Sequence, residues 1–168
     1  MRHPWRTIPV DKEVDNICSS KYANGGGLWG DSYWFIAEGT GSTANGLTCH
    51  GDVHLILCDS ASITIAKGLY LNAGSTLHIY SQSFDGKMGK LISENSESDQ
   101  PGIGPQHDDS YMGVLHIHGG DIKAKGGKKA AGIGGCKDRS SGEIRIFGGK
   151  IQATGGESGA GIGGGYGG

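Results

Sequence analysis

Histidine and aromatic residues recur at one place in several short, similar stretches of the sequence. Between two aliphatic neighbours the stretches carry in turn His54, His78, His116 and Arg145. Two residues further along they carry Ile56, Tyr80, His118 and Phe147. Because residues two apart on an extended chain point to the same side, we predict two outward columns on one face.

This face has the chemistry of a carbohydrate-binding surface. Aromatic and imidazole rings beside polar donors suit sugars, whose C–H faces stack on rings and whose hydroxyls form hydrogen bonds. We predict a ligand-binding face made of Tyr80, His118, Phe147, His78, His116 and Arg145. The alternative is that the face packs against the N-terminal segment or a partner subunit.

The same residues suggest little other chemistry. No catalytic motif stands out, so we predict no catalytic residue and no cofactor. Stacked histidines can bind a transition metal. However, the sequence has no Cys-x-x-Cys pair and shows no cysteine or carboxylate at ligand spacing beside these histidines. We therefore predict no metal site.

An internal repeat indicates which elements position these side chains. The last third of the chain repeats with a period of 29 residues and no gaps. The repeated apolar positions are Leu115, Ile117, Ile122, Ala124, Ala131 and Ile133, which return as Ile144, Ile146, Ile151, Ala153, Ala160 and Ile162. Period-two alternation indicates short strands, and the Gly-Gly pairs between them permit sharp corners because glycine tolerates positive φ. Three strands then make a triangular rung, and rungs stacked in parallel form an all-β, parallel β-helix.

The pattern extends upstream in a looser form and predicts about five rungs. Their expected ranges are 33–52, 53–76, 77–113, 114–142 and 143–168, with an insertion at about 81–112. The repeat also predicts a shared interior in which Ile117 stacks on Ile146, Ile122 on Ile151 and Ile133 on Ile162.

The first part of the chain is richer in aromatic residues. We expect residues 1–32 to cap the N-terminal end of a β-helix over residues 33–168, because an uncovered strand edge invites aggregation. The alternative is that the aromatic residues near this end, Trp5, Trp29 and Trp34 among them, form a sugar-binding platform.

Composition narrows the function classes. The net charge of −2 argues against a nucleic-acid partner. No apolar stretch is long enough to span a membrane, and the first residues do not read as a signal peptide. Cys58 and Cys136 occupy rung positions and are expected to be reduced packing residues, whereas a disulfide between Cys18 and Cys49 is left open.

Several motifs together resemble a known kind of repeat region. They are the stretches 51–57, 75–82 and 89–91 and the two copies that end in Ala-Gly-Ile-Gly-Gly. Over roughly residues 30–168 they resemble Gly-rich repeat regions in large surface proteins of gut Firmicutes and related anaerobes. The resemblance implies a right-handed parallel β-helix with an extracellular adhesive or carbohydrate-binding role, and it supplies no catalytic residues.

We therefore predict a non-enzymatic β-helix module of a bacterial surface protein, for adhesion or carbohydrate binding. A structural or self-assembling spacer is the first alternative. A polysaccharide lyase or glycoside hydrolase, by fold analogy only, is the second. The expected partner is a glycan, and the expected location is the cell surface or the extracellular space if the chain belongs to a longer secreted protein. Because the sequence stops after a completed third strand, we also expect either self-association through the last rung or continuation into a longer chain.

Overall fold

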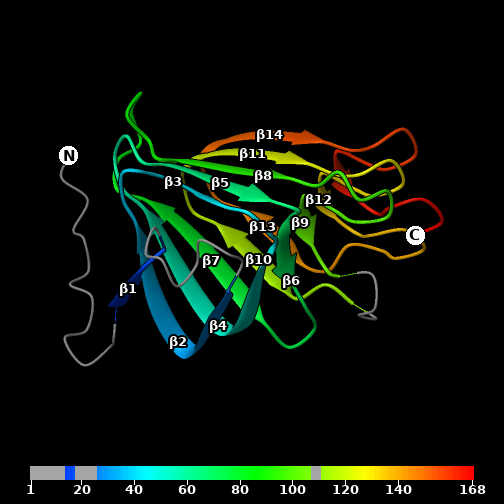
Figure 1. The fold of residues 1–168 in the computed structure, drawn as a ribbon, viewed down its shortest axis with the longest axis horizontal. Helices are drawn as coiled ribbons and strands as arrows, with labels where there is room; N and C mark the ends of the chain where they lie inside the picture. The colour runs from blue at the N-terminus through cyan, green and yellow to red at the C-terminus, as the bar shows by residue number, and fades with distance from the viewer. Residues whose placement is uncertain (1–13, 18–25, 107–110) are drawn as a thin grey trace.

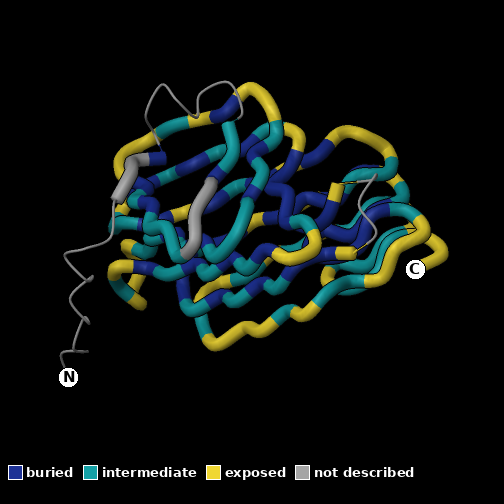
Figure 2. Tube along the Cα trace, turned by 90° about the horizontal axis from the view of Figure 1, so that it is seen from below, coloured by how far each residue is buried: buried dark blue, intermediate teal, exposed yellow. Residues whose placement is uncertain are grey.

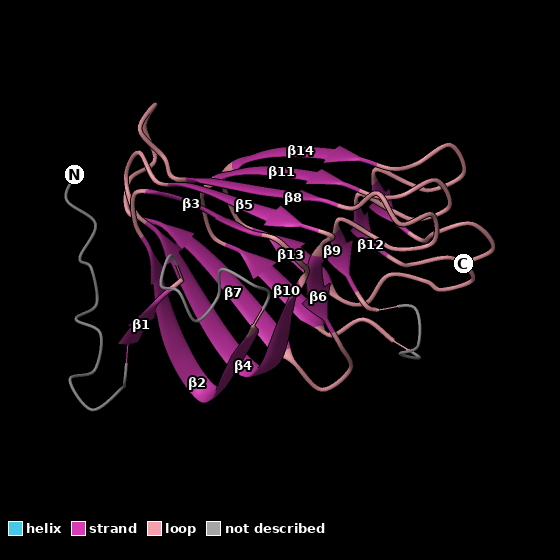
Figure 3. Ribbon diagram, viewed as in Figure 1, coloured by secondary structure: helices cyan, strands magenta, loops and turns pink. Residues whose placement is uncertain are grey.

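The computed structural model describes residues 14–17, 26–106 and 111–168, and in this part of the chain every regular element is a β-strand (Figures 1 and 3). The strands wind into a solenoid, and each of its faces is a stack of parallel strands. The predicted parallel β-helix is therefore confirmed.

The first face is a stack of parallel strands that starts with the N-terminal strands and continues to the C-terminal winding. In order of pairing they are β1 (Val14–Asn16), β2 (Gly27–Ala37), β4 (Leu47–Leu57), β7 (Thr76–Ser81), β10 (Val114–Ile117) and β13 (Ile144–Ile146). The long strand β4 serves two faces: its first residues pair with the third face and its last residues with β7.

The second face holds one strand from each of the five windings in the described part of the chain. These strands are β3 (Thr40–Thr43), β5 (Ser62–Ala66), β8 (Lys90–Glu94), β11 (Asp121–Lys125) and β14 (Lys150–Thr154). The third face continues from the start of β4 through β6 (Leu69–Leu71), β9 (Ile103–Gly104), β12 (Ile133–Gly134) and β15 (Ile162–Gly163).

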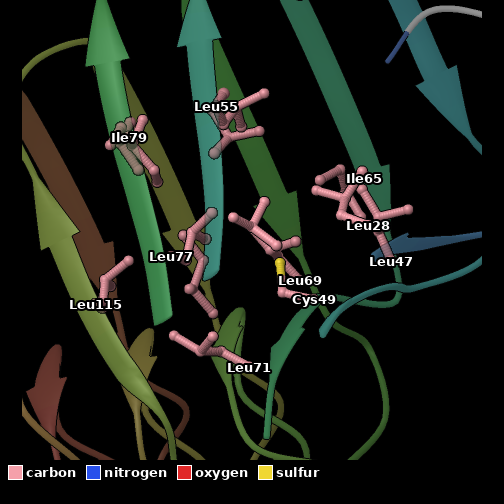
Figure 4. Close-up of a cluster of buried hydrophobic side chains, with 14 of the residues drawn as sticks. Leu28, Leu47, Cys49, Leu55, Ile65, Leu69, Leu71, Leu77, Ile79 and Leu115 are labelled. Carbon is pink, nitrogen blue, oxygen red and sulfur yellow. The ribbon is translucent and has the colours of Figure 1, made fainter. Parts of the chain in front are cut away.

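The interior is a set of aliphatic columns. In one of them Val53, Leu77, Leu115 and Ile144 are paired in register from strand to strand. Figure 4 shows Leu55, Leu77, Ile79 and Leu115 among the buried side chains of this core. Burying each such side chain contributes roughly 1.5–3 kcal/mol, so the stacked columns supply the main driving force for the fold.

The predicted isoleucine stacking is confirmed, but burial differs between the two copies. Ile117 pairs with Ile146, Ile122 with Ile151, and Ile133 with Ile162. The first member of each pair is fully buried, whereas Ile146 is 44% and Ile162 is 46% exposed. In Figure 2 the last winding accordingly carries many exposed residues, drawn in yellow. The expected self-association through this rung stays a prediction.

The glycine corners work in two different ways. Gly120 and Gly149 have φ of +111° and +100°, as expected for a sharp corner between the first and second faces. At the next corner Gly127 has no positive φ. There a Cβ would collide with the Glu97 carbonyl oxygen of the preceding winding. Glycine is thus required at this second corner because the backbones approach closely. On sequence grounds both corners are explained by positive φ alone.

The expected insertion at about 81–112 is interrupted by regular strands, because β8 and β9 lie within it. Most of the extra length lies in residues 82–89, which connect β7 to β8. In the next winding the equivalent connection, from β10 to β11, consists of residues 118–120 only. The rung thus widens at one corner and keeps all three of its strands.

The expected cap over residues 1–32 lies mostly outside the described residues, as do Trp5 and Cys18. Within it, β1 adds a parallel strand beside β2, and β2 crosses residue 32 with a register shift between Asp31 and Tyr33. Cys49, left open as a disulfide partner, is a buried free thiol whose pKa is raised to about 12 by burial. Cys58 and Cys136 are also free thiols, as expected.

Candidate functional site: a ladder of rings on the first face

The outward side chains of the first face form the predicted columns, here called the ring ladder. The first column runs through Trp34, His54, His78, His116 and Arg145, which are paired in register across β2, β4, β7, β10 and β13. The second column runs from Ile56 to Tyr80, His118 and Phe147. All six predicted site residues therefore lie on one face.

Ring-on-ring contact follows from the parallel register, because equivalent residues on adjacent strands repeat at the strand spacing. The ring centroids of Trp34 and His54 are 4.2 Å apart, and those of His54 and His78 are 4.6 Å apart, with nearly parallel planes. In the second column Tyr80 and His118 are 4.5 Å apart, and His118 and Phe147 are 4.9 Å apart.

His116 breaks the parallel arrangement. Its ring stands at 73° to His78 and at 90° to His118. Its Nε2 is buried without a hydrogen-bond partner among the described residues, and the nearest carboxylate oxygen, Glu143 Oε1, is 3.7 Å away. The same Glu143 oxygen forms an ion pair with Arg145 Nε at 2.6 Å.

Polar contacts tie the two columns together. His54 Nδ1 and the Tyr80 hydroxyl lie 3.3 Å apart, and His78 Nδ1 and His118 Nε2 also lie 3.3 Å apart. The remaining His78 nitrogen, Nε2, is 3.5 Å from Asp52 Oδ1.

Asp52 is itself held in place. Its Oδ2 accepts a hydrogen bond from the Ser32 hydroxyl at 2.9 Å and lies 3.4 Å from His54 Nε2. A carboxylate thus faces the neighbouring imidazoles of His54 and His78.

Burial keeps three side chains of the ladder, His78, His118 and Tyr80, uncharged at neutral pH. Burial, reinforced by repulsion from His54, lowers the pKa of His78 to about 4. Burial and His116 also lower the pKa of His118. Burial and Asp52 raise the pKa of Tyr80. Both histidines are therefore neutral imidazoles, each able to accept as well as donate a hydrogen bond.

Stacking determines what the surface offers to a ligand. Rings that cover one another along the stack expose mainly their edges, and the side chains of His54, His78 and His116 are only 14%, 19% and 18% exposed. Phe147 differs, because it is 63% exposed. The ladder thus combines polar ring edges with an exposed aromatic ring.

Sequence reasoning missed four residues of this face. Trp34 was assigned to the aromatic N-terminal part, although its stretch aligns with that of His54 without a gap. Asp52 and Glu143 lie two residues before His54 and Arg145, so period-two alternation places them on the same side. Phe84, 59% exposed, comes from the 82–89 connection and lies close to Gly119, the residue that follows His118 in the sequence. For Phe84 the sequence held no signal.

Comparison with known proteins agrees with the fold and gives no function. A family model described as "Beta helix repeat" matches residues 115–135 and 144–166, the two copies of the 29-residue repeat. No curated protein and no solved structure matches the chain. These two segments are thus β-helix repeats. The resemblance to surface proteins of gut Firmicutes stays a prediction.

Among the described residues, no helix is long and apolar enough to cross a membrane.

Proposed function

We propose that the chain is a non-enzymatic β-helix module that binds carbohydrate through the ring ladder, as part of an adhesive protein at a bacterial surface. One observation carries this proposal: polar ring edges and the exposed ring of Phe147 share one face of the solenoid. A sugar offers a C–H face to rings such as Phe147 and Phe84 and hydroxyls to the ring edges. The ion pair of Arg145 and Glu143 adds a charged donor and an acceptor beside Phe147.

The spacing of carboxylates supports binding over hydrolysis. Asp52 and Glu143 flank the ladder from its second and fifth windings. Three strand spacings of about 4.8 Å separate their backbones by roughly 14 Å. Glycosidases need two carboxyl groups about 5–9.5 Å apart. Asp52 and Glu143 are therefore not placed as such a pair.

A purely structural role is the alternative, and the mutual stacking of the rings favours it. In that case the ladder would stabilise the register between windings without binding anything. The two roles differ in what the removal of an exposed, weakly packed side chain of the ladder does. Only in the binding role should it weaken the affinity for a glycan.

The test is a glycan array, followed by titration of any glycan that binds. Arg145→Ala combined with Phe147→Ala removes two exposed side chains, and we expect it to weaken binding at least about tenfold while the melting temperature stays within a few degrees of the parent. Gln152→Ala is the matched control, because Gln152 is exposed on the second face of the same winding. Unchanged binding by the double variant, or no glycan bound at all, would contradict the proposal.

A further inference from the structure

The ladder brings together ligand groups that the sequence did not predict to meet. The ligand atoms of His78, His116 and His118 lie within 4.8 Å of one another. The three residues come from two adjacent strands and the residue that follows one of them: His116 lies on β10, His118 comes directly after β10, and His78 faces His116 from β7. Residues on paired strands hold their side chains on a rigid base, which favours a preformed site.

We propose that His78, His116 and His118 bind a zinc ion on the ladder face. Three imidazoles with an open fourth position are a recognised zinc ligand set, and imidazole suits this class of metal. The proposal departs from the sequence-based prediction of no metal. It stands independently of carbohydrate binding, since it concerns the metal alone.

The distances fit such a site. In a tetrahedral zinc site the metal–nitrogen distance is about 2.0–2.1 Å, so ligand nitrogens are roughly 3.4 Å apart. His78 Nδ1 and His118 Nε2 already lie 3.3 Å apart. The His116 ring is nearly perpendicular to both, so the third imidazole approaches from a different direction, as a tetrahedral set requires.

Carboxylates stand behind two of the three rings. If His78 binds through Nδ1, its Nε2 faces Asp52 Oδ1, which is 3.5 Å away and has no hydrogen-bond partner among the described residues. His116 Nε2 lies 3.7 Å from Glu143 Oε1, an oxygen that also pairs with Arg145 Nε, and this arrangement leaves Nδ1 for the ion. Metal-binding histidines commonly direct their second nitrogen at a carboxylate, which fixes the tautomer and makes the ring a stronger ligand. The sequence-based argument against a metal assumed that no carboxylate lies beside the histidines.

A second cluster, Asp52, His54 and His78, also meets the distance requirement but fits less well. The rings of His54 and His78 are parallel to within 9°, as those of His78 and His118 are to within 18°, but this cluster has no turned ring comparable to His116. Asp52 Oδ2 is already used by the Ser32 hydroxyl. We therefore assign the ion to the three-histidine cluster.

The test is calorimetric titration of the chelator-treated protein with zinc chloride, in the absence of any glycan. We expect saturable binding of a single ion per chain. His116→Asn and His118→Asn should each weaken binding by roughly tenfold or more, since each removes a ligand. His50→Asn is the matched control, because His50 lies on β4 outside both clusters.

A second measurement needs no variant and guards against misfolding. In protein labelled with nitrogen-15 at histidine, zinc should shift the ring nitrogens of His78, His116 and His118, while those of His50 stay in place. Cobalt(II), added as a spectroscopic substitute, should give the visible absorption of a tetrahedral complex.

The proposal is overturned if zinc does not bind saturably, or if binding is unchanged in both His116→Asn and His118→Asn. Binding that His54→Asn abolishes and His118→Asn leaves intact would place the ion in the neighbouring cluster and equally overturn this assignment. Loss of zinc binding leaves the glycan titration to decide the proposed function separately.

Discussion

At the scale of single residues, His78 occupies the centre of the ring ladder. His54 and Asp52 face it from β4, and Tyr80 shares its strand. His116 on β10 and His118 directly after β10 face it from the other side. Burial and the neighbouring imidazoles oppose its protonation, and Asp52 only partly offsets them. Acidification should therefore place an unfavourable charge in the middle of the ladder.

This predicts a pH dependence of stability with a definite sign. The unfolded chain binds a proton at His78 near pH 6.5, and the folded chain binds it only near pH 4. Between these values the unfolded state holds more protons, so the free energy of unfolding falls as pH falls through this window. Thermal melts of metal-free protein from pH 7 to pH 4 should show this decline, and His78→Asn should flatten it. The His50→Asn control should keep the parent slope; an equal slope in His78→Asn would refute the role of His78.

Asn95 is a second residue whose contribution can be measured. It is 3% exposed, and its Nδ2 donates to the Lys67 and Pro101 carbonyl oxygens and to the Tyr70 hydroxyl. Its Oδ1 accepts from the Glu97 backbone N–H. Because Asn95→Ala leaves these buried groups unpaired, we expect a loss of about 1–3 kcal/mol in denaturant unfolding. A loss within the error of the Gln152→Ala control would show that water replaces the amide.

At the scale of elements, the third face depends on glycines stacked strand over strand. Gly134 on β12 pairs with Gly163 on β15, and both have positive φ. A Cβ on Gly134 would collide with the Gly163 carbonyl oxygen. Side chains at this position would force adjacent windings apart.

We therefore expect Gly134→Ala to be strongly destabilising. Positive φ costs an alanine about 1–2 kcal/mol and the collision adds roughly 1–3 kcal/mol, measured as the loss of unfolding free energy. Gly86→Ala is the control, because a Cβ there meets no atom within 4 Å, and it should be nearly neutral. If both variants unfold alike, the third-face packing described above is incorrect.

The sequence predicts the strands and their outward side chains better than the contacts between windings. The ungapped repeat predicted the strands around Ile117, Ile122 and Ile133 and the side of His116 and His118, because period-two alternation is a local property. It did not predict the turned ring of His116 or the approach of Asp52 to His78, which depend on side-chain torsions and on contacts between windings. The position of Phe84 close to Gly119 depends on an irregular connection with no repeat to guide it.

At the scale of the whole molecule, stability should be graded along the stack. Ile117 and Ile146 are the same residue type, paired in register, yet one is fully buried and the other 44% exposed. We expect Ile117→Ala to cost about 2–5 kcal/mol and Ile146→Ala less than half as much, because a half-exposed side chain leaves a smaller cavity. Parallel denaturant titrations of the two variants measure the difference. Equal losses would mean that Ile146 is covered in solution, as the expected self-association through the last rung would produce.

In the proposed function one face of the solenoid binds ligand while the other two serve the fold. Chemical-shift mapping of the isotope-labelled protein, with the tightest glycan from the array, tests it most directly. We expect the largest shifts on the backbone amides of β7, β10 and β13 and of the 82–89 connection, and almost none on β5, β8, β11 and β14. Shifts centred on the second face, or spread evenly over the molecule, would contradict it.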